Sequence, residues 1–418
     1  MQTADKPPPP KHINNYMKEG FCMGVLSGVK VLDLTRLLPG PYCTLLMADY
    51  GAEVIKIEEP GNGDYIRWRT PAIEGIGARH LTVNRNKKSV ELNLKTAEGQ
   101  QIFKQLAAEA DVIIESFRPG VMERLGLAYE DIVKVNERIV YCSLTGYGQT
   151  GPYRQLPGHD INFIGYSGIL GLIGEKNGKP VVPGVQIADI GGGSLMALAA
   201  ICMALFHRER TGKGQYIDVS MMDGAITWLY TAMSDYFASG TTPQRGATRL
   251  DGQFAFYNVY ETRDGKYMTV GASEFKFWKK MCELIGKEEW IPLHEGPTDV
   301  QEQFKQDLDK LFKEHDQQYW TELLALEDTC VGPVHDIDDM FSDPQIIARD
   351  MFTDMQHPVA GTIKQIGFPI KFSETPGEIY AHSPTLGEHT AQILTQLGYS
   401  ADDIKHFSEA GVIGQAES

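Results

Sequence analysis

Hydrophobic and polar positions follow two different periods along the first half of the chain. Short runs rich in valine, isoleucine and leucine, such as residues 28–34 and 111–117, have the length of single buried strands. Longer amphipathic stretches, such as residues 39–51 and 95–110, lie between these runs. Apolar strands that alternate with helices are typical of a parallel sheet covered on both faces. The pattern therefore predicts a doubly wound, Rossmann-like α/β domain over residues 24–222.

The pattern changes in the second half of the chain. Residues 254–273 form two β-runs around Asp264 and Gly265, a pair of residue types that favours tight hairpin turns. Amphipathic helical segments follow, so we expect a smaller α+β domain over residues 223–328. Residues 329–418 show helical periodicity again, and we expect them to return to the large domain.

Composition and charge limit the classes of partner. A chain of 418 residues is long for one hydrophobic core, and its apolar fraction of 42% excludes a disordered protein. A net charge of −16 argues against nucleic acid and anionic membrane surfaces as partners, so any anionic ligand needs a locally basic pocket. The longest apolar run, residues 195–206, is shorter than the roughly 20 residues of a membrane span. We expect it to form a buried helix.

The N-terminus and the cysteines favour a cytoplasmic protein. Residues 1–23 carry charged side chains and four consecutive prolines where a secretory leader would need an apolar segment, so we expect a loosely ordered tail. The six cysteines are scattered without the spacing of metal ligands, which is typical of reduced thiols. We therefore expect no metal site.

One glycine-rich stretch, GYGQTG at residues 146–151, matches the dinucleotide-binding pattern G-x-G-x-x-G. The context does not fit that function, because Pro152 and Pro157 stand where the phosphate-binding helix should run. No acidic residue ends a second strand about 20 positions further on. The stretch is better interpreted as a flexible loop beside a ligand.

Three ionisable residues stand at positions where chemistry and plain structure are both possible. Asp189 precedes three glycines and a long apolar helix, so it is either a helix N-cap or a carboxylate beside backbone N–H donors that could stabilise an oxyanion. Glycines there would also let a substrate approach the backbone. His159 lies in a GHDIN stretch and is either a loop histidine or an acid/base group. Glu274 follows a predicted strand at a predicted helix start.

Several longer stretches resemble the family III CoA-transferases, the CaiB/BaiF group. They include LDLTRLLPGPYCTLLMADYGAEVIKIEEPGNGD, ESFRPGVMERLGL and TGKGQYIDVSMMDG, and the resemblance extends from about residue 24 to residue 414. The family contains CoA-transferases and α-methylacyl-CoA racemases on one fold. In the transferases, the aspartate that matches Asp189 is a nucleophile that forms an acyl anhydride while CoA moves between carboxylic acids.

The racemase branch of the family has a histidine and a glutamate in its site besides the aspartate, and His159 and Glu274 match them. The resemblance implies that Asp189 and His159 exchange the α-proton of a 2-methyl-branched acyl-CoA through an enolate, while Glu274 orients the imidazole. Inversion needs an acid and a base on opposite faces of the α-carbon. The backbone N–H of Asp189 would then receive the enolate oxygen. We therefore expect an acyl-CoA racemase or epimerase, with a family III CoA-transferase as the alternative.

The resemblance also implies an interlocked homodimer in which Glu274 reaches the active site from the partner subunit. CoA enters as part of the acyl-CoA substrate, and no resident cofactor is expected. Two departures from the family pattern leave the acyl group open: Glu59 stands where several relatives carry arginine, and residues 252–257 differ from the usual GGAPFY. The expected CoA contacts are Arg36, Pro39, Arg85, Arg118, Arg124 and Asp160.

Overall fold

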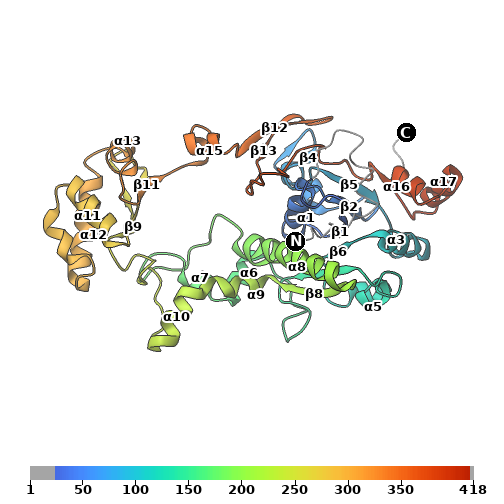
Figure 1. Cartoon of the computed structure of the whole chain (residues 1–418), viewed down its shortest axis with the longest axis horizontal. Helices are drawn as coiled ribbons and strands as arrows, with labels where there is room; N and C mark the ends of the chain where they lie inside the picture. Colours follow the sequence, from blue (N-terminus) through green and yellow to red (C-terminus); the bar gives the residue numbers. More distant parts are fainter. Residues whose placement is uncertain (1–23, 415–418) are drawn as a thin grey trace, which may run out of the picture. The chain divides into compact units, whose positions relative to one another are not determined.

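The computed structural model describes residues 24–414, which form two compact units (Figure 1). The first unit contains residues up to 167, residues 185–227 and residues 349 onward, and the second contains residues 168–184 and 228–348. The tail predicted over residues 1–23 lies outside the described residues.

The first unit is built on a six-stranded parallel sheet with the order β5-β2-β1-β6-β7-β8. The four inner strands are short apolar runs of the sequence, the two edge strands, KKSVE and QYIDVS, are more polar, and helices lie between the strands, as expected for a doubly wound α/β domain. The strands are β1 (Lys30–Leu34), β2 (Glu53–Glu58), β5 (Lys87–Glu91), β6 (Val112–Glu115), β7 (Val140–Thr145) and β8 (Gln215–Ser220).

Helices cover both faces of this sheet. On one face, Leu32 and Leu34 of β1 belong to a buried core with residues of α3 (Ala97–Glu109), α5 (Tyr129–Ile132) and α16 (Thr390–Gln396). The alternate residue Asp33 points the other way, where its carboxylate accepts a hydrogen bond from Thr44 of α1 (Pro39–Asp49) at 2.6 Å. Helix α8 (Leu195–Thr211) packs beside α1 on that second face.

Helix α8 is less buried than its apolar sequence predicts. A π-helical segment, η3 (Ile187–Ser194), runs directly into it, so the combined helix of 25 residues is long and apolar enough to cross a membrane by length and composition alone. Only one side of α8 is covered, because a sheet can bury one face of a helix: Met203 is 70% and Phe206 is 60% exposed. The prediction of a buried helix was therefore only half right.

The second unit contains a three-stranded antiparallel sheet with the order β11-β10-β9. The hairpin predicted at Asp264 and Gly265 joins β9 (Tyr257–Glu261) to β10 (Tyr267–Gly271), with Gly265 at a φ of 76°. Strand β11 (Val331–Val334) pairs with β10, which places the chain as far as residue 348 in this unit rather than ending it at 328. The larger helices are α10 (Tyr230–Ser239), α11 (Phe275–Leu284) and α12 (Thr298–Phe312).

The C-terminal segment returns to the first unit, but it does not begin as a helix. It forms the hairpin of β12 (Phe352–His357) and β13 (Gly361–Ile366) before α16 and α17 (Ala401–Glu409). The expectation of a purely helical segment was wrong because alternate residues such as Met355 and Ile363 are buried, which is the period of a strand. The segment is also tied to the N-terminal part, since Arg67 donates to the Pro384 carbonyl at 2.9 Å.

The remaining elements are short. In the first unit they are η2 (Tyr65–Arg67), β3 (Ala72–Ile73), β4 (Ile76–Gly77), α2 (Ala78–Val83), α4 (Val121–Arg124), α6 (Asp160–Tyr166) and α9 (Met221–Ile226). The second unit adds α7 (Ile169–Leu172), η5 (Glu288–Leu293), α13 (Gln317–Trp320), η6 (Thr321–Ala325), α14 (Ile337–Met340) and α15 (Pro344–Ala348). A single 3₁₀ turn, η4 (Thr227–Leu229), joins α9 to α10.

Candidate active site

The strand order locates the expected ligand site of the large sheet. From β1 the chain moves outward to β2 and β5, and then returns to β6 on the other side of β1. In open α/β sheets, ligands bind at the carboxyl ends of the strands where the order reverses. The loops that follow β1 and β6 meet at this point, and they carry Arg36 and Arg118.

Arg36 is held between two aromatic rings at this switch point. Its guanidinium lies 5.1 Å from the ring centre of Tyr65 and 5.4 Å from that of Phe117. Its Nη1 also donates to the Tyr65 hydroxyl at 2.7 Å. We call Arg36, Tyr65 and Phe117 the switch-point cradle. Neither aromatic residue was predicted to belong to the site, although Phe117 ends a predicted strand and Tyr65 lies shortly after β2.

Glu59, the residue that departs from the family pattern, lies beside this cradle. Its carboxylate is 2.8 Å from Lys95 and 3.9 Å from Arg36. The hydrogen bond from Lys95 and the charges of both cations lower the pKa of Glu59, so the side chain is anionic at neutral pH. Part of the Arg36 charge is therefore already neutralised in the free protein.

The other predicted CoA residues differ in exposure. Arg118 and Arg124 are exposed, whereas Pro39 is buried at the start of α1, where its carbonyl accepts a hydrogen bond from Ser194 at 2.6 Å. Pro39 thus links α1 to the π-helical segment. Arg118 also lines a cavity of about 360 Å³ at the ends of β6, β7 and β8.

Arg85 does not face a ligand in this structure. It is 2% exposed, and its guanidinium contacts Asp49 at 2.7 Å and also donates to Gln365 and to the Ile366 carbonyl. An arginine can bind a phosphate, but the charge of Arg85 is paired with Asp49 inside the first unit. Arg85 thus has a structural role in the first unit, and its contact with CoA stays a prediction.

The GYGQTG stretch forms a loop after β7 and not a dinucleotide-binding turn. Gly148 has a φ of 80°, and the N–H of Gln149 donates to Asp218 at 3.0 Å. Residues 152–158 contain no helix, so a phosphate-binding helix is missing from this part of the chain. Gln149 lines the same cavity as Arg118, which places the loop beside a hollow as predicted.

Asp189 lies inside the π-helical segment and not at a helix N-cap, because Gln186 is the N-cap residue. Its carboxylate has no hydrogen-bond partner among residues 24–414. Burial and, second, the negative charge of Asp160 raise the pKa of Asp189 from its ordinary 3.8 to about 7. A carboxyl group with this pKa exchanges protons readily near neutral pH.

Asp160 connects the start of α6 to Asp189. Its Oδ1 accepts hydrogen bonds from the backbone N–H of Ala188 at 2.7 Å and of Asp189 at 2.9 Å. The Asp189 N–H that was expected to receive an enolate oxygen therefore already has an acceptor. Asp160, expected to contact CoA, thus also supports the π-helical segment. Nothing in the sequence indicates this contact, which joins residues 29 positions apart.

His159 immediately precedes Asp160 and is exposed. It occupies the N-cap position of α6, where its backbone N–H donates to Asn162 at 3.0 Å. Since Asp160 is bonded to the backbone of Asp189, the start of α6 that carries His159 is fixed beside the π-helical segment. The structure thus brings together the two backbone segments that carry His159 and Asp189, two of the three predicted catalytic residues.

The third predicted catalytic residue, Glu274, belongs to the second unit. It is exposed and is the N-cap residue of α11, with no side-chain hydrogen bond to that helix. The prediction of a helix start at this position is confirmed.

Gly192, one of the three glycines after Asp189, serves packing. It is buried, and a Cβ atom there would lie 2.5 Å from the Met221 carbonyl oxygen. A Cβ atom on Gly224 would lie 2.0 Å from the Gly192 carbonyl oxygen. Helix α9 and the π-helical segment therefore touch through their backbones, and the access of a substrate at the glycines stays a prediction.

Within residues 24–414 no group of three or more histidine, cysteine, aspartate or glutamate side chains is arranged to hold a metal ion. The fold and the surroundings of Asp189 define an α/β protein with a candidate carboxylate active site beside a parallel sheet. The chain belongs to CoA-transferase family III, because the sequence model of that family matches residues 26–390.

Known proteins of two activities are similar to this chain. Human succinyl-CoA:glutarate CoA-transferase is 36% identical over 400 residues, covering 94% of this chain and 91% of that protein. Human alpha-methylacyl-CoA racemase is 33% identical over 394 residues, covering 93% and 97%. The crystal structure of a CaiB/BaiF family protein from Brucella suis has a TM-score of 0.79 and 34% identity, covering 90% of this chain and 99% of that chain. The protein is thus a family III enzyme of either type.

Proposed function

We propose that the protein is an acyl-CoA racemase or epimerase that inverts the α-carbon of a 2-methyl-branched acyl-CoA. The observation that carries this proposal is the double hydrogen bond from the Ala188 and Asp189 backbone to Asp160. This contact fixes His159 at the edge of the segment that presents Asp189. A histidine and a carboxylic acid then stand on neighbouring elements, as a two-base proton transfer requires.

The proposed reaction is a proton transfer through an enolate. The ionised carboxylate of Asp189 removes the α-proton, the electron pair of the C–H bond moves into the enolate, and the imidazolium of His159 returns a proton to the opposite face. In the reverse direction the two residues exchange roles. The unpaired Asp189 carboxyl, with its pKa of about 7, suits either protonation state at neutral pH.

The CoA moiety is proposed to bind at the switch point of the sheet. Arg36, Arg118 and Arg124 supply positive charge for its phosphates, and the aromatic rings of the switch-point cradle offer stacking surfaces for its base. Locally basic groups are needed, because the net charge of the chain is −16.

A homodimer is proposed from the exposed side of α8. A monomer in water rarely leaves residues such as Met203 and Phe206 uncovered along one helix, and a second copy of the chain would bury them. The family resemblance adds that the dimer is interlocked and that Glu274 acts from the partner subunit, where it would orient the imidazole of His159. A cytoplasmic location is proposed as well, since Cys43, Cys142, Cys202, Cys282 and Cys330 are all free.

The second candidate is a CoA-transferase that moves CoA between carboxylic acids. The similarity to succinyl-CoA:glutarate CoA-transferase favours it. In this alternative the Asp189 carboxylate attacks the thioester carbonyl, forms a mixed anhydride and releases CoA as a thiolate. An unpaired carboxylate suits this attack too, so geometry alone leaves both chemistries open to Asp189.

One experiment separates the two candidates. A racemase should incorporate deuterium at Cα from D₂O into a single 2-methylacyl-CoA without any acceptor acid, and His159→Ala should slow racemisation by about 10²- to 10⁴-fold. A panel of short, long and aryl-branched acyl-CoAs covers the unknown acyl group. The racemase proposal fails if no member exchanges deuterium while CoA is transferred to an added acid and hydroxylamine traps an acyl-enzyme.

A further inference from the structure

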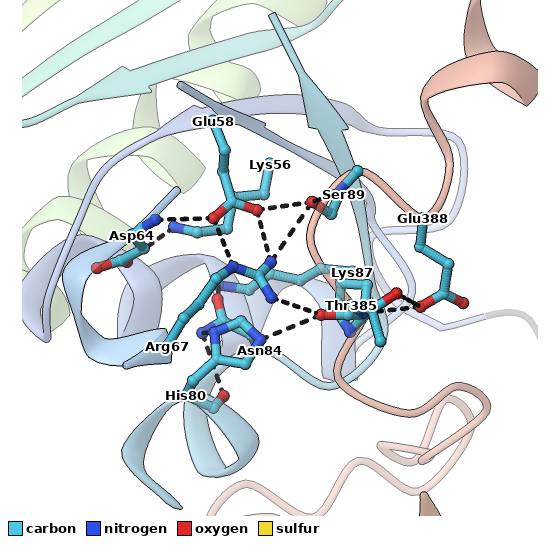
Figure 2. A network of polar contacts seen from close by, with 12 residues as sticks. Lys56, Glu58, Asp64, Arg67, His80, Asn84, Lys87, Ser89, Thr385 and Glu388 are labelled. Atoms are coloured by element: carbon cyan, nitrogen blue, oxygen red, sulfur yellow. Dashed lines mark hydrogen bonds and ion pairs between the residues drawn. The ribbon is translucent and has the colours of Figure 1, made fainter. Parts of the chain in front are cut away.

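A buried network of charges lies beneath the loop that joins β1 to α1. It contains three cations and three anions, and every member is at most 5% exposed. Figure 2 shows most of this network, with Lys56 beside Asp64 and with Arg67 between Glu58 and the C-terminal segment. The six residues are Asp33, Lys56, Glu58, Asp64, Arg67 and Lys87.

Stability alone does not explain such a network. Buried ion pairs lose much of their attraction to desolvation, and well-packed apolar residues often replace them without loss. The positive and negative members are equal in number, so the network carries no net charge of its own. What it does provide is a set of charged donors and acceptors at fixed positions under the β1–α1 loop.

These charges hold the loop backbone on both sides of Arg36. The carbonyl of Thr35 accepts from Lys56 at 2.7 Å, and the N–H of Thr35 donates to Asp33 at 2.9 Å. The N–H of Leu37 donates to both oxygens of Asp64, at 3.0 and 3.1 Å. Arg36 lies between these two fixed residues, so its position is set by the network.

The conformation of Leu37 shows why the loop needs an anchor. Its φ is 66°, in the left-handed region where a residue with a Cβ atom is strained. A free loop would leave this conformation for a relaxed one and carry Arg36 with it. Asp64, which accepts the Leu37 N–H with both of its oxygens, stabilises this strained backbone conformation.

The same carboxylate also fixes the other side of the cradle. Asp64 is the N-cap residue of η2, where its Oδ1 accepts the N–H of Ile66 at 3.2 Å. Tyr65 is the first residue of that turn and receives the hydrogen bond from Arg36. One buried carboxylate therefore sets both Arg36 and Tyr65.

We infer that Asp64, held by Lys56, is a positioning residue that keeps Arg36 and Tyr65 in place to bind the nucleotide end of CoA. The inference rests on the proposed binding of CoA at the switch point. Asp64 itself is 1% exposed and acts only through the two residues that it fixes.

The test compares CoA affinity with turnover in the full-length protein. Asp64→Asn replaces one acceptor oxygen by an NH₂ group, so one of the two oxygens that accept the Leu37 N–H is lost. We expect the Kd for CoA, measured by calorimetry, to rise about tenfold, and the KM for the acyl-CoA to rise with it while kcat changes less than twofold. Adding Leu37→Gly to Asp64→Asn should recover part of the affinity, because glycine adopts a φ of 66° without strain.

A matched control and a second variant keep the test decisive. Asp111→Asn breaks the ion pair with Arg208, 2.9 Å long, in the same unit and at the opposite end of the strands from the loop, and should leave the Kd within twofold of the wild-type value. If Asp64→Asn does not fold, Lys56→Met with Asp64→Leu removes both charges together and leaves no unpaired one. That double variant should fold and show the same tenfold loss of affinity.

The outcomes separate this inference from the function on which it rests. A folded Asp64→Asn variant with wild-type affinity, or an equal loss in Asp111→Asn, overturns the positioning role. Failure of both network variants to fold also overturns it, because the network would then be purely structural. If the wild-type protein does not bind CoA, or if Arg36→Ala binds it unchanged, the proposed CoA site is wrong instead.

Discussion

The charge of Asp160 should be measurable at Asp189 as a change in pH dependence. Asp160→Asn keeps an oxygen that can accept the N–H groups of Ala188 and Asp189, but it removes the negative charge. Without that charge, ionising Asp189 becomes easier. We therefore expect the pKa of Asp189 to fall in this variant, with the position of α6 unchanged.

The size of the effect follows from the causes of the raised pKa. It rises from 3.8 to about 7, with burial as the larger cause and Asp160 as the smaller. Removal of the smaller cause should reverse less than half of the rise. We therefore expect a decrease of about one pH unit, which corresponds to about 1.4 kcal/mol.

The assay is the pH profile of kcat/KM for deuterium exchange, which reports groups of the free enzyme. If Asp189 acts as the base, the acidic limb should lie near pH 7 in the wild-type protein and near pH 6 in Asp160→Asn. Asp223→Asn, on α9, is the control and should not move the limb. The Asp189 carboxyl carbon, assigned by its loss in Asp189→Asn, gives the same pKa by ¹³C NMR without turnover.

Two results would refute this reasoning. A limb and a carboxyl titration that stay within about 0.3 pH units of wild type would mean that the Asp160 charge does not reach Asp189. A shift to higher pH would mean that Asp160 stabilises the anion through the backbone donors more than it repels it.

Three further predictions concern stability and assembly. Because the pKa of Asp189 is raised in the folded protein, the free energy of unfolding of the wild type should fall as the pH rises from about 4 to about 7. Asp189→Asn should lack this fall and should be more stable than the wild type by about 2 kcal/mol at pH 8, after allowance for the partial exposure of Asp189. The same pH dependence of the melting temperature in both proteins would contradict this prediction. Gly224→Ala should lower the free energy of unfolding in urea by about 2 kcal/mol or more, because the new Cβ atom would lie 2.0 Å from the Gly192 carbonyl oxygen. The control Gly165→Ala, whose Cβ atom would have no neighbour within 4 Å, should leave the stability unchanged or raise it slightly. Met203→Glu should give a monomer in sedimentation equilibrium if α8 forms the dimer interface, and a wild-type monomer would exclude that interface.

The sequence predicted the large sheet well because most of its strands are short runs rich in valine, isoleucine and leucine that alternate with helices. A fully buried strand such as β6 is recognisable without knowledge of its neighbours. The β12–β13 hairpin was missed because only alternate residues are apolar and the others include Thr353, Asp354 and Lys364, which resemble an exposed segment.

The candidate site depends on contacts between distant residues, and the sequence could predict only part of it. Asp189, His159 and Glu274 were found through resemblance to the family, but the acceptance of the Asp189 N–H by Asp160 depends on how α6 meets the π-helical segment. Arg85 has the residue type of a phosphate ligand, and only the fold shows that Asp49, 36 positions earlier, neutralises it. Residue type alone cannot distinguish these outcomes.

The return of the C-terminal segment to the first unit has a consequence for biosynthesis. The Arg67 side chain receives its acceptor, the Pro384 carbonyl, from a part of the chain that is made more than 300 residues later. At roughly 5 to 20 residues per second, a ribosome needs on the order of 15 to 60 seconds to make that intervening stretch. During this time Arg67 lacks its Pro384 acceptor, so the buried charge network is completed only after most of the chain has been made.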